Sequence, residues 1–274
     1  MSFSKYKFGV TQGRLTKSSE LQRFPYEAWQ LEFGNASEIG ISYIELLSEE
    51  NFNPNNPLWS SLGRAEIKNL CKNNKLDLYS IVCDYSIAHS LIDDFENNSC
   101  AHYTKNLFPA AYDLGCNIIV LPLMEESNID AKNMYKFKNV LEYLSNEANN
   151  QNIKICLETH LKSSDIVDLL ISINKENIKA VFDTGNKVVL DEDIYSEILT
   201  LNKYLKHVHI KDKNIEGNNV ILGEGLVKFK DVFLALNKIN YCGSLTFETQ
   251  RGTEPIKTHK FSINLCNSFI NDVK

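Results

Sequence analysis

The chain has 274 residues, of which 43% are hydrophobic and 23% are charged, a composition that supports a buried core and excludes a disordered chain. Lys and Arg number 29 against 35 Asp and Glu, so the net charge of -6 disfavours nucleic acid as a partner. No apolar run approaches the roughly 18 residues of a membrane span, and no signal-peptide core follows the start. We therefore expect a cytoplasmic protein without a membrane partner.

Short apolar runs that are typical of buried strands recur along the chain. The eight runs lie at residues 8–12, 42–46, 76–82, 117–123, 153–158, 178–183, 205–210 and 244–248. Helix-length stretches separate them, and the apolar residues of these stretches recur every three or four positions, most clearly at 131–148 and 227–239. Strand and helix therefore alternate through the whole sequence.

This alternation predicts an α/β protein built as a single (β/α)8 TIM barrel, with one domain over residues 1–274. Eight parallel strands bury one another's edges when the sheet closes, and the helices cover the outside. An open doubly wound sheet is the main alternative. Against it, the first strand is followed by Gln12-Gly13-Arg14-Leu15 rather than by a G-x-G-x-x-G turn, and no linker separates two domains.

Four consecutive predicted strands, the fifth to the eighth, each end on a polar residue: Glu158, Asp183, His209 and Glu248. The carboxyl ends of the strands form the functional face of such a barrel. Side chains alternate along a strand, so these four share the barrel-facing side if the large apolar residues just before them face the helices. Those residues are Leu157, Phe182, Val208 and Phe247.

Three carboxylates that converge in a buried barrel mouth repel one another unless a cation lies between them. The pattern therefore predicts one divalent metal ion held by Glu158, Asp183, His209 and Glu248. Oxygen-rich ligation with one imidazole suits Mn²⁺, Mg²⁺ or Co²⁺, and Zn²⁺ is also compatible.

Three basic residues follow predicted strands and could bind an anionic group of a substrate: Arg14, Lys211 and Arg251. Gly223-Glu224-Gly225 lies in the loop after the seventh strand, where barrels often bind phosphate through backbone N–H groups. Each cation has the alternative role of a solvated or ion-paired loop residue.

Three further polar residues lie near the predicted mouth. Glu45, near the end of the second strand, and His160, just past Glu158, could touch substrate hydroxyls, but we expect both to be rim residues. His207 precedes His209 by one inward-facing position, and we expect it to be a core histidine.

Between Glu158 and Arg251 the motifs LETH, FDTGN, HVHIKD, LGEG followed by a helix, and TFETQRG occur in order. In these motifs the chain resembles the xylose isomerase-like barrel superfamily, and within it the sugar phosphate isomerase/epimerase group, which includes 3-epimerases of ketoses and ketopentose phosphates. The resemblance implies the same four metal ligands, with Glu158 and Glu248 also serving as the acid/base pair. It also implies a homo-oligomer. The resemblance also implies that Asn186 binds the substrate. Asn186 takes a position where some free-sugar epimerases have histidine and some phosphosugar members have asparagine, which favours a phosphorylated substrate.

Together these observations predict a metal-dependent sugar or sugar-phosphate epimerase or isomerase that moves a proton next to a ketose carbonyl through an enediolate. A metal-dependent dehydratase of a polyol ketone is the first alternative, because the same intermediate could expel a hydroxyl. An apurinic endonuclease-like hydrolase and a non-catalytic sugar-binding barrel are weaker alternatives. The endonucleases of this superfamily need extra histidines after the second to fourth strands, and the third and fourth runs end in IVCDY and LPL instead.

Overall fold

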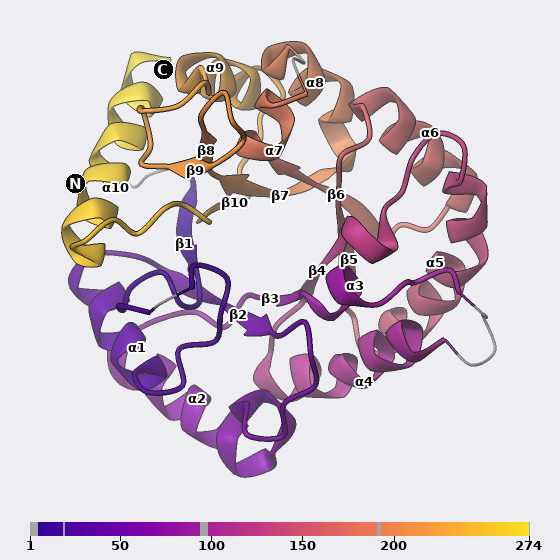
Figure 1. Ribbon diagram of the computed structural model, residues 1–274, viewed down its shortest axis with the longest axis horizontal. Helices are drawn as coiled ribbons and strands as arrows, with labels where there is room; N and C mark the ends of the chain where they lie inside the picture. The colour runs from indigo at the N-terminus through magenta and orange to yellow at the C-terminus, as the bar shows by residue number, and fades with distance from the viewer. Residues whose placement is uncertain (1–4, 19, 94–97, 191–192, 274) are drawn as a thin grey trace.

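Eight parallel strands close into a barrel in the computed structural model (Figure 1), which describes residues 5–18, 20–93, 98–190 and 193–273. Hydrogen-bonded neighbours follow the order β1-β10-β7-β6-β5-β4-β3-β2 around the barrel. The strands are β1 (Lys7–Thr11), β2 (Tyr43–Ser48), β3 (Ser80–Cys83), β4 (Ile118–Leu123), β5 (Lys154–Thr159), β6 (Ile178–Asp183), β7 (Leu205–Ile210) and β10 (Ser244–Phe247). Each corresponds to one predicted run, so the TIM barrel prediction is confirmed.

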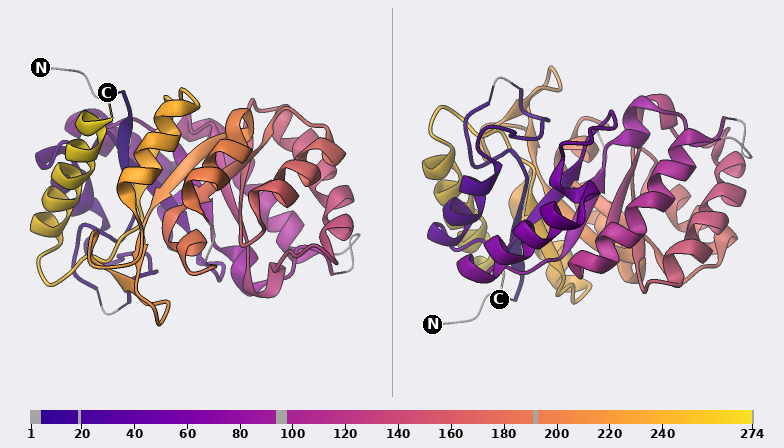
Figure 2. Two further views of the ribbon diagram at one scale, coloured as in Figure 1. Left: turned by 90° about the horizontal axis from the view of Figure 1, so that it is seen from above. Right: turned by 90° about the horizontal axis from the view of Figure 1, so that it is seen from below.

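Helices between successive strands cover the outside of the barrel (Figures 1 and 2). The longer ones are α1 (Trp29–Glu38), α2 (Ser61–Asn74), α4 (Ser99–Leu114), α5 (Met134–Asn149), α6 (Ser163–Ile173), α8 (Ile194–Leu201), α9 (Phe229–Lys238) and α10 (Pro255–Asp272). Capping residues set several boundaries: the side chains of Ser60, Asn98 and Asp193 accept hydrogen bonds from the first turns of α2, α4 and α8. No helix in the described ranges is long and apolar enough to cross a membrane.

Short elements that the sequence pattern did not predict follow the carboxyl ends of the strands. They are η1 (Pro57–Trp59), α3 (Tyr85–Ala88), η3 (Glu125–Ser127), α7 (Thr184–Val188) and a ribbon of β8 (Asp212–Lys213) and β9 (Asn219–Val220). These pieces are shorter than the window over which a helical or strand period can be recognised. They build up the functional end of the barrel.

The strand register places the predicted site residues at one level. Asp183 in β6 lies opposite His209 in β7, and His209 lies opposite Thr246 in β10, two residues before Glu248. A shift in pairing between Ala180 and Val181 adjusts β6 to this register. The four apolar residues that alternate with the site residues are fully buried: Leu157, Phe182, Val208 and Phe247.

A small residue and a large one share the barrel interior below the site. A Cβ atom at Gly9 in β1 would lie 2.0 Å from Cζ of Tyr43 in the neighbouring strand β2. The Tyr43 ring is completely buried, and its hydroxyl lies 2.5 Å from Oγ1 of Thr246 in β10, the strand on the other side of β1. Gly9 therefore leaves the space that Tyr43 fills beneath the mouth.

We predict that Gly9→Ala lowers the free energy of unfolding by about 2–3 kcal/mol, because overpacking must displace a buried ring. Gly34→Ala is the matched control: Gly34 is exposed in α1, and its nearest neighbour to an added Cβ is 3.9 Å away. This change should be neutral or stabilise by about 0.5–1 kcal/mol. Urea titration measures both, and equal stability of the two variants would contradict the packing described.

Candidate active site

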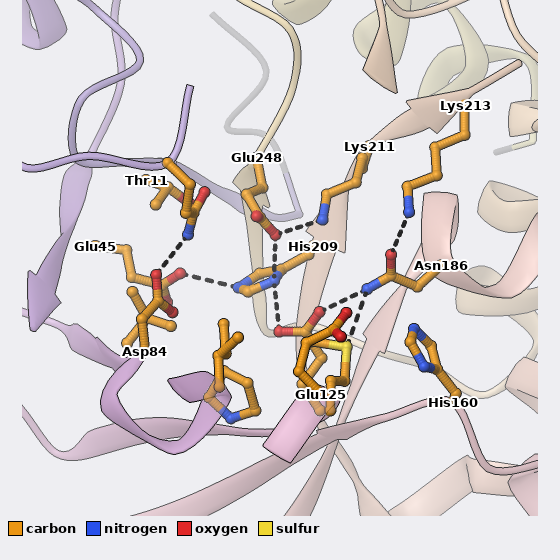
Figure 3. A pocket seen from close by; sticks show the side chains of 16 residues that line it. Thr11, Glu45, Asp84, Glu125, His160, Asn186, His209, Lys211, Lys213 and Glu248 are labelled. Atoms are coloured by element: carbon orange, nitrogen blue, oxygen red, sulfur yellow. Dashed lines mark hydrogen bonds and ion pairs between the residues drawn. The ribbon is translucent and has the colours of Figure 1, made fainter. Parts of the chain in front are cut away.

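A pocket of about 250 Å³ opens at the carboxyl ends of the barrel strands (Figure 3). Its wall includes Glu158, His209 and Glu248 of the predicted quartet, and Asp183 lies buried next to them. The volume lies just below the usual range for small-molecule pockets. The pocket therefore suits a compact ligand.

The structure brings the four predicted ligands to one point. One ligand atom from each of Glu158, Asp183, His209 and Glu248 lies within 4.8 Å of all the others. Nδ1 of His209 is 3.1 Å from Oε2 of Glu248, 3.4 Å from Oε2 of Glu158 and 3.8 Å from Oδ2 of Asp183. Three carboxylates thus surround one imidazole nitrogen.

The other imidazole nitrogen of His209 fixes which tautomer the ring adopts. Nε2 lies 2.9 Å from Oε1 of Glu45, and an ionised carboxylate only accepts hydrogen bonds. When the ring is neutral, its hydrogen is therefore on Nε2, and Nδ1 is the atom that can offer a lone pair to a cation among the three carboxylates. A carboxylate behind a metal-bound histidine commonly has this orienting role.

Two buried atoms at this point make no hydrogen bond within the protein. Nδ1 of His209 and Oδ2 of Asp183 make no hydrogen bond, although Nζ of Lys211 lies 3.1 Å from the aspartate oxygen. Buried polar atoms without hydrogen bonds are rare in proteins and call for an explanation. One imidazole nitrogen and carboxylate oxygens directed at one point are a donor set that fits a divalent cation, so the residues present fit a metal ion.

The charged groups of the cluster shift one another's pKa values. Burial opposes ionisation of His209, but the carboxylates of Glu45 and Glu158 hold its pKa well above the usual value. Burial would raise the pKa of Glu248, but Lys211 holds it well below its usual value. In Asp183 burial prevails over Lys211, and the pKa is raised. The cluster therefore attracts a proton or another cation to its centre.

A second cluster of potential ligands consists of Glu45, His207 and His209, so His209 belongs to both clusters. Nε2 of His207 lies 2.8 Å from Oε2 of Glu45, and its Nδ1 lies 2.8 Å from Oγ of Ser244. Ser80 donates a further hydrogen bond of 2.7 Å to Oε2 of Glu45. Every ring nitrogen and carboxylate oxygen of Glu45 and His207 has a partner, so this group is a hydrogen-bonded support rather than a metal site.

This support corrects one prediction. Glu45 was expected on the rim, but it is completely buried, because β2 continues past it to Ser48. His207 is also completely buried, as expected of a core histidine.

Lys211 and Asn186, two of the predicted substrate-binding residues, lie on the pocket wall and contact the quartet. Nζ of Lys211 is 3.0 Å from Oε2 of Glu248. Asn186 donates a hydrogen bond of 2.9 Å from Nδ2 to Oε1 of Glu158, and its Oδ1 accepts one of 2.9 Å from Lys213 (Figure 3). Lys213 was not predicted as a site residue. It lies two positions after Lys211, a spacing that would place both side chains on the same side of an extended segment.

Arg14 is not part of the pocket wall in the described structure, but it lies behind Glu248. Its Nη2 is 3.6 Å from Oε1 of Glu248 and donates a hydrogen bond of 2.5 Å to Oε1 of Gln22. Nε2 of Gln22 in turn donates to Oδ2 of Asp84 at 2.8 Å. A continuous set of contacts therefore links Glu248 to a second carboxylate on the pocket wall.

Arg251 also lies outside the described pocket wall, and its guanidinium holds the loop after β1. It donates hydrogen bonds to four backbone carbonyls of that loop, those of Gly13, Thr16, Ser18 and Glu20. The carboxylate of Glu32 accepts hydrogen bonds from backbone N–H groups of the same loop. Together these contacts place Arg14 and Gln22 beside the site.

Asp84 is a wall residue for which the sequence did give a signal. It follows β3 directly, just as the quartet residues close their strands, and it is 2% exposed. Gln22 lies in a loop without any periodic pattern, so no comparable signal identifies it.

The chain belongs to a known family. A family model described as "Xylose isomerase-like TIM barrel" matches residues 33–267. The resemblance noted in the sequence is thereby confirmed at the level of the family.

Similar proteins of described function match only part of the chain. Inosose dehydratase of Clostridium beijerinckii is 28% identical over 137 residues, which cover 40% of this chain and 45% of that protein. Ketose 3-epimerase of Arthrobacter globiformis is 34% identical over 80 residues, which cover 29% of this chain and 26% of that protein. The matched region thus spans less than half the length of either relative.

Solved structures match the whole fold at low sequence identity. An L-ribulose 3-epimerase superposes with a TM-score of 0.79 at 14% identity, over 98% of this chain and 95% of the other. D-psicose 3-epimerase from Clostridium cellulolyticum H10 has a TM-score of 0.76 at 16% identity, over 96% and 99%. These similarities establish the shared fold.

We predict that Glu45→Gln lowers the affinity for Mn²⁺ by about 10–100-fold, because the variant no longer fixes the His209 tautomer. Isothermal titration calorimetry measures the affinity, and circular dichroism checks the fold. Glu176→Gln, an exposed change in the turn between α6 and β6, is the control and should bind Mn²⁺ like the unchanged protein. Equal affinity in Glu45→Gln would show that Glu45 does not orient the ligand.

Proposed function

We propose that the protein is a metal-dependent sugar epimerase or isomerase that moves a proton next to a ketose carbonyl. The observation that carries this proposal is the convergence of three carboxylates and Nδ1 of His209, with Glu158 and Glu248 both on the pocket wall. The similarity to ketose 3-epimerase supports the same reaction class.

Glu158, Asp183, His209 and Glu248 would hold the metal ion. Their oxygen-rich set suits Mn²⁺, Mg²⁺ or Co²⁺, and Zn²⁺ is compatible. When bound, a divalent ion at this point supplies Lewis-acid polarisation of a carbonyl oxygen and stabilises the negative charge that develops on it. In the described ranges both candidate groups include His209, an arrangement that does not support the trinuclear zinc site of an endonuclease.

Glu158 and Glu248 would also act as the acid/base pair. Asn186 holds Oε1 of Glu158, whereas Lys211 and Arg14 lie beside Glu248, so the two carboxylates have different surroundings. If one removes the proton and the other returns it to the opposite face, the carbon is inverted. If the proton returns to the neighbouring carbon, the reaction is aldose/ketose isomerisation.

A dehydratase acting on a polyol ketone is the second candidate, and the similarity to inosose dehydratases favours it. Both reactions begin with removal of a proton next to a carbonyl. The dehydratase then loses a neighbouring hydroxyl, which must be protonated as it leaves. The product therefore separates the two candidates. The homo-oligomer and the cytoplasmic location stay predictions.

We expect the Mn²⁺-loaded protein to exchange one carbon-bound hydrogen of a ketose for solvent deuterium, as followed by NMR in D2O. Glu248→Gln should reduce this exchange at least about 100-fold, because an amide cannot take up the proton. Glu176→Gln should exchange at the unchanged rate. An inverted product indicates an epimerase, an aldose an isomerase, and an absorbing unsaturated product a dehydratase.

Undiminished exchange by Glu248→Gln would remove that residue from the acid/base pair. Absence of exchange with every ketose and keto-polyol tested, despite bound Mn²⁺, would contradict the proposed function as a whole.

A further inference from the structure

The chain's own Asp212 binds the loop of Gly223 and Gly225, which the sequence pattern indicated for phosphate binding. Its Oδ2 accepts hydrogen bonds from the backbone N–H groups of Gly223 and Gly225 at 2.9 and 3.0 Å, and its Oδ1 accepts one from Val227 at 3.0 Å. Asp212 is completely buried. Converging N–H groups of this kind bind anions, and here a carboxylate already fills the site.

The arginines near the site are also engaged by the protein. Arg251 donates to backbone carbonyls of the loop after β1, and Arg14 contacts Gln22 and Glu248. Neither guanidinium belongs to the described pocket wall. No planar, bidentate partner for a phosphate is therefore available from these two residues.

The two lysines on the pocket wall provide little unpaired positive charge for a phosphate dianion. Lys211 lies about equally close to Asp183 and Glu248, at 3.1 and 3.0 Å. Lys213 donates to the amide of Asn186, and the carboxylate of Glu125 lines the same pocket. A phosphate group would face at most one lysine whose charge has no carboxylate partner, among several acidic side chains.

A buried carboxyl group lies on the other side of the pocket. Asp84 is 2% exposed and lines the pocket, and Gln22 is its one side-chain hydrogen-bond partner in the described ranges. Figure 3 shows Asp84 on the side opposite Lys213 and His160, with Glu248 and His209 between them. Burial raises the pKa of Asp84 to about 7, so its carboxyl can both donate and accept hydrogen bonds near neutral pH.

We propose that the substrate is an uncharged polyol ketone and that Asp84, held by Gln22, binds one of its hydroxyls and thereby determines specificity. This inference rests on the proposed function, because it concerns the far end of the same substrate. A carboxyl group hydrogen-bonds to a hydroxyl in either protonation state, and in its ionised state it repels a phosphate at the same place. It reverses the preference for a phosphorylated substrate that Asn186 suggested.

The test measures binding to the Mn²⁺-loaded protein by isothermal titration calorimetry. The probes are ketopentoses, ketohexoses and a keto-inositol, together with ketopentose 5-phosphates and ketohexose 6-phosphates. We expect a neutral ketone to bind at least about 10-fold more tightly than any of the phosphates. Asp84→Ala should weaken binding of that ketone by about 10–30-fold, in keeping with the loss of one buried hydrogen bond.

Two variants keep the result interpretable. Asp84→Asn retains one hydrogen-bonding group, so it should weaken binding of the neutral ketone less than Asp84→Ala and should bind phosphates better than the unchanged protein. Asp168→Asn, an exposed change in α6, should leave all affinities unchanged.

Tighter binding of a phosphate by the unchanged protein, or equal binding of the neutral ketone by Asp84→Ala, would overturn the inference. Failure of every neutral ketone to bind would overturn it as well. If neutral ketones bind through Asp84 but no deuterium exchange occurs, the proposed function fails and the binding role of Asp84 stands. If deuterium exchange occurs and Asp84→Ala binds the neutral ketone normally, the binding role of Asp84 fails and the proposed function stands.

Discussion

The site depends on one buried arrangement, in which Nδ1 of His209 faces three carboxylates. Glu45 behind the ring holds the hydrogen on Nε2, so the ring cannot turn a donor toward these carboxylates without gaining a second proton. Like charges converging in a buried place are costly, and a divalent cation relieves that cost. The closed barrel makes the convergence possible, because adjacent strands bring their carboxyl ends to one mouth.

Two different sets of contacts hold the two glutamates of this site. Asn186 and Lys213 lie behind Glu158, whereas Arg14, Gln22 and Asp84 extend from Glu248. The second set comes largely from the loop after β1, which is fixed by Arg251 and Glu32. Residues far apart in the sequence thus orient one carboxylate, and the same loop brings Gln22 to the wall where we place the substrate's far end.

The barrel and the quartet could be predicted because both follow from local patterns. Side chains alternate along a strand, so the apolar residues next to Glu158 and Glu248 indicate that these two glutamates face the barrel interior. The strand-helix repeat then places both glutamates at the same end of the barrel. The burial of Glu45 was missed because β2 extends two residues beyond the apolar run. The role of Arg251 was missed because its partners lie more than 230 residues away in the sequence. Such long-range contacts leave no periodic signal.

The most direct test of the proposed metal site is the anomalous scattering of a crystal soaked in Mn²⁺. We expect one anomalous peak, which marks an ion at about 2.0–2.3 Å from Nδ1 of His209 and from oxygens of Glu158, Asp183 and Glu248. Nε2 of His209 should remain hydrogen-bonded to Glu45. A peak between Glu45 and His207, or no peak among the four residues at saturating Mn²⁺, would contradict the account.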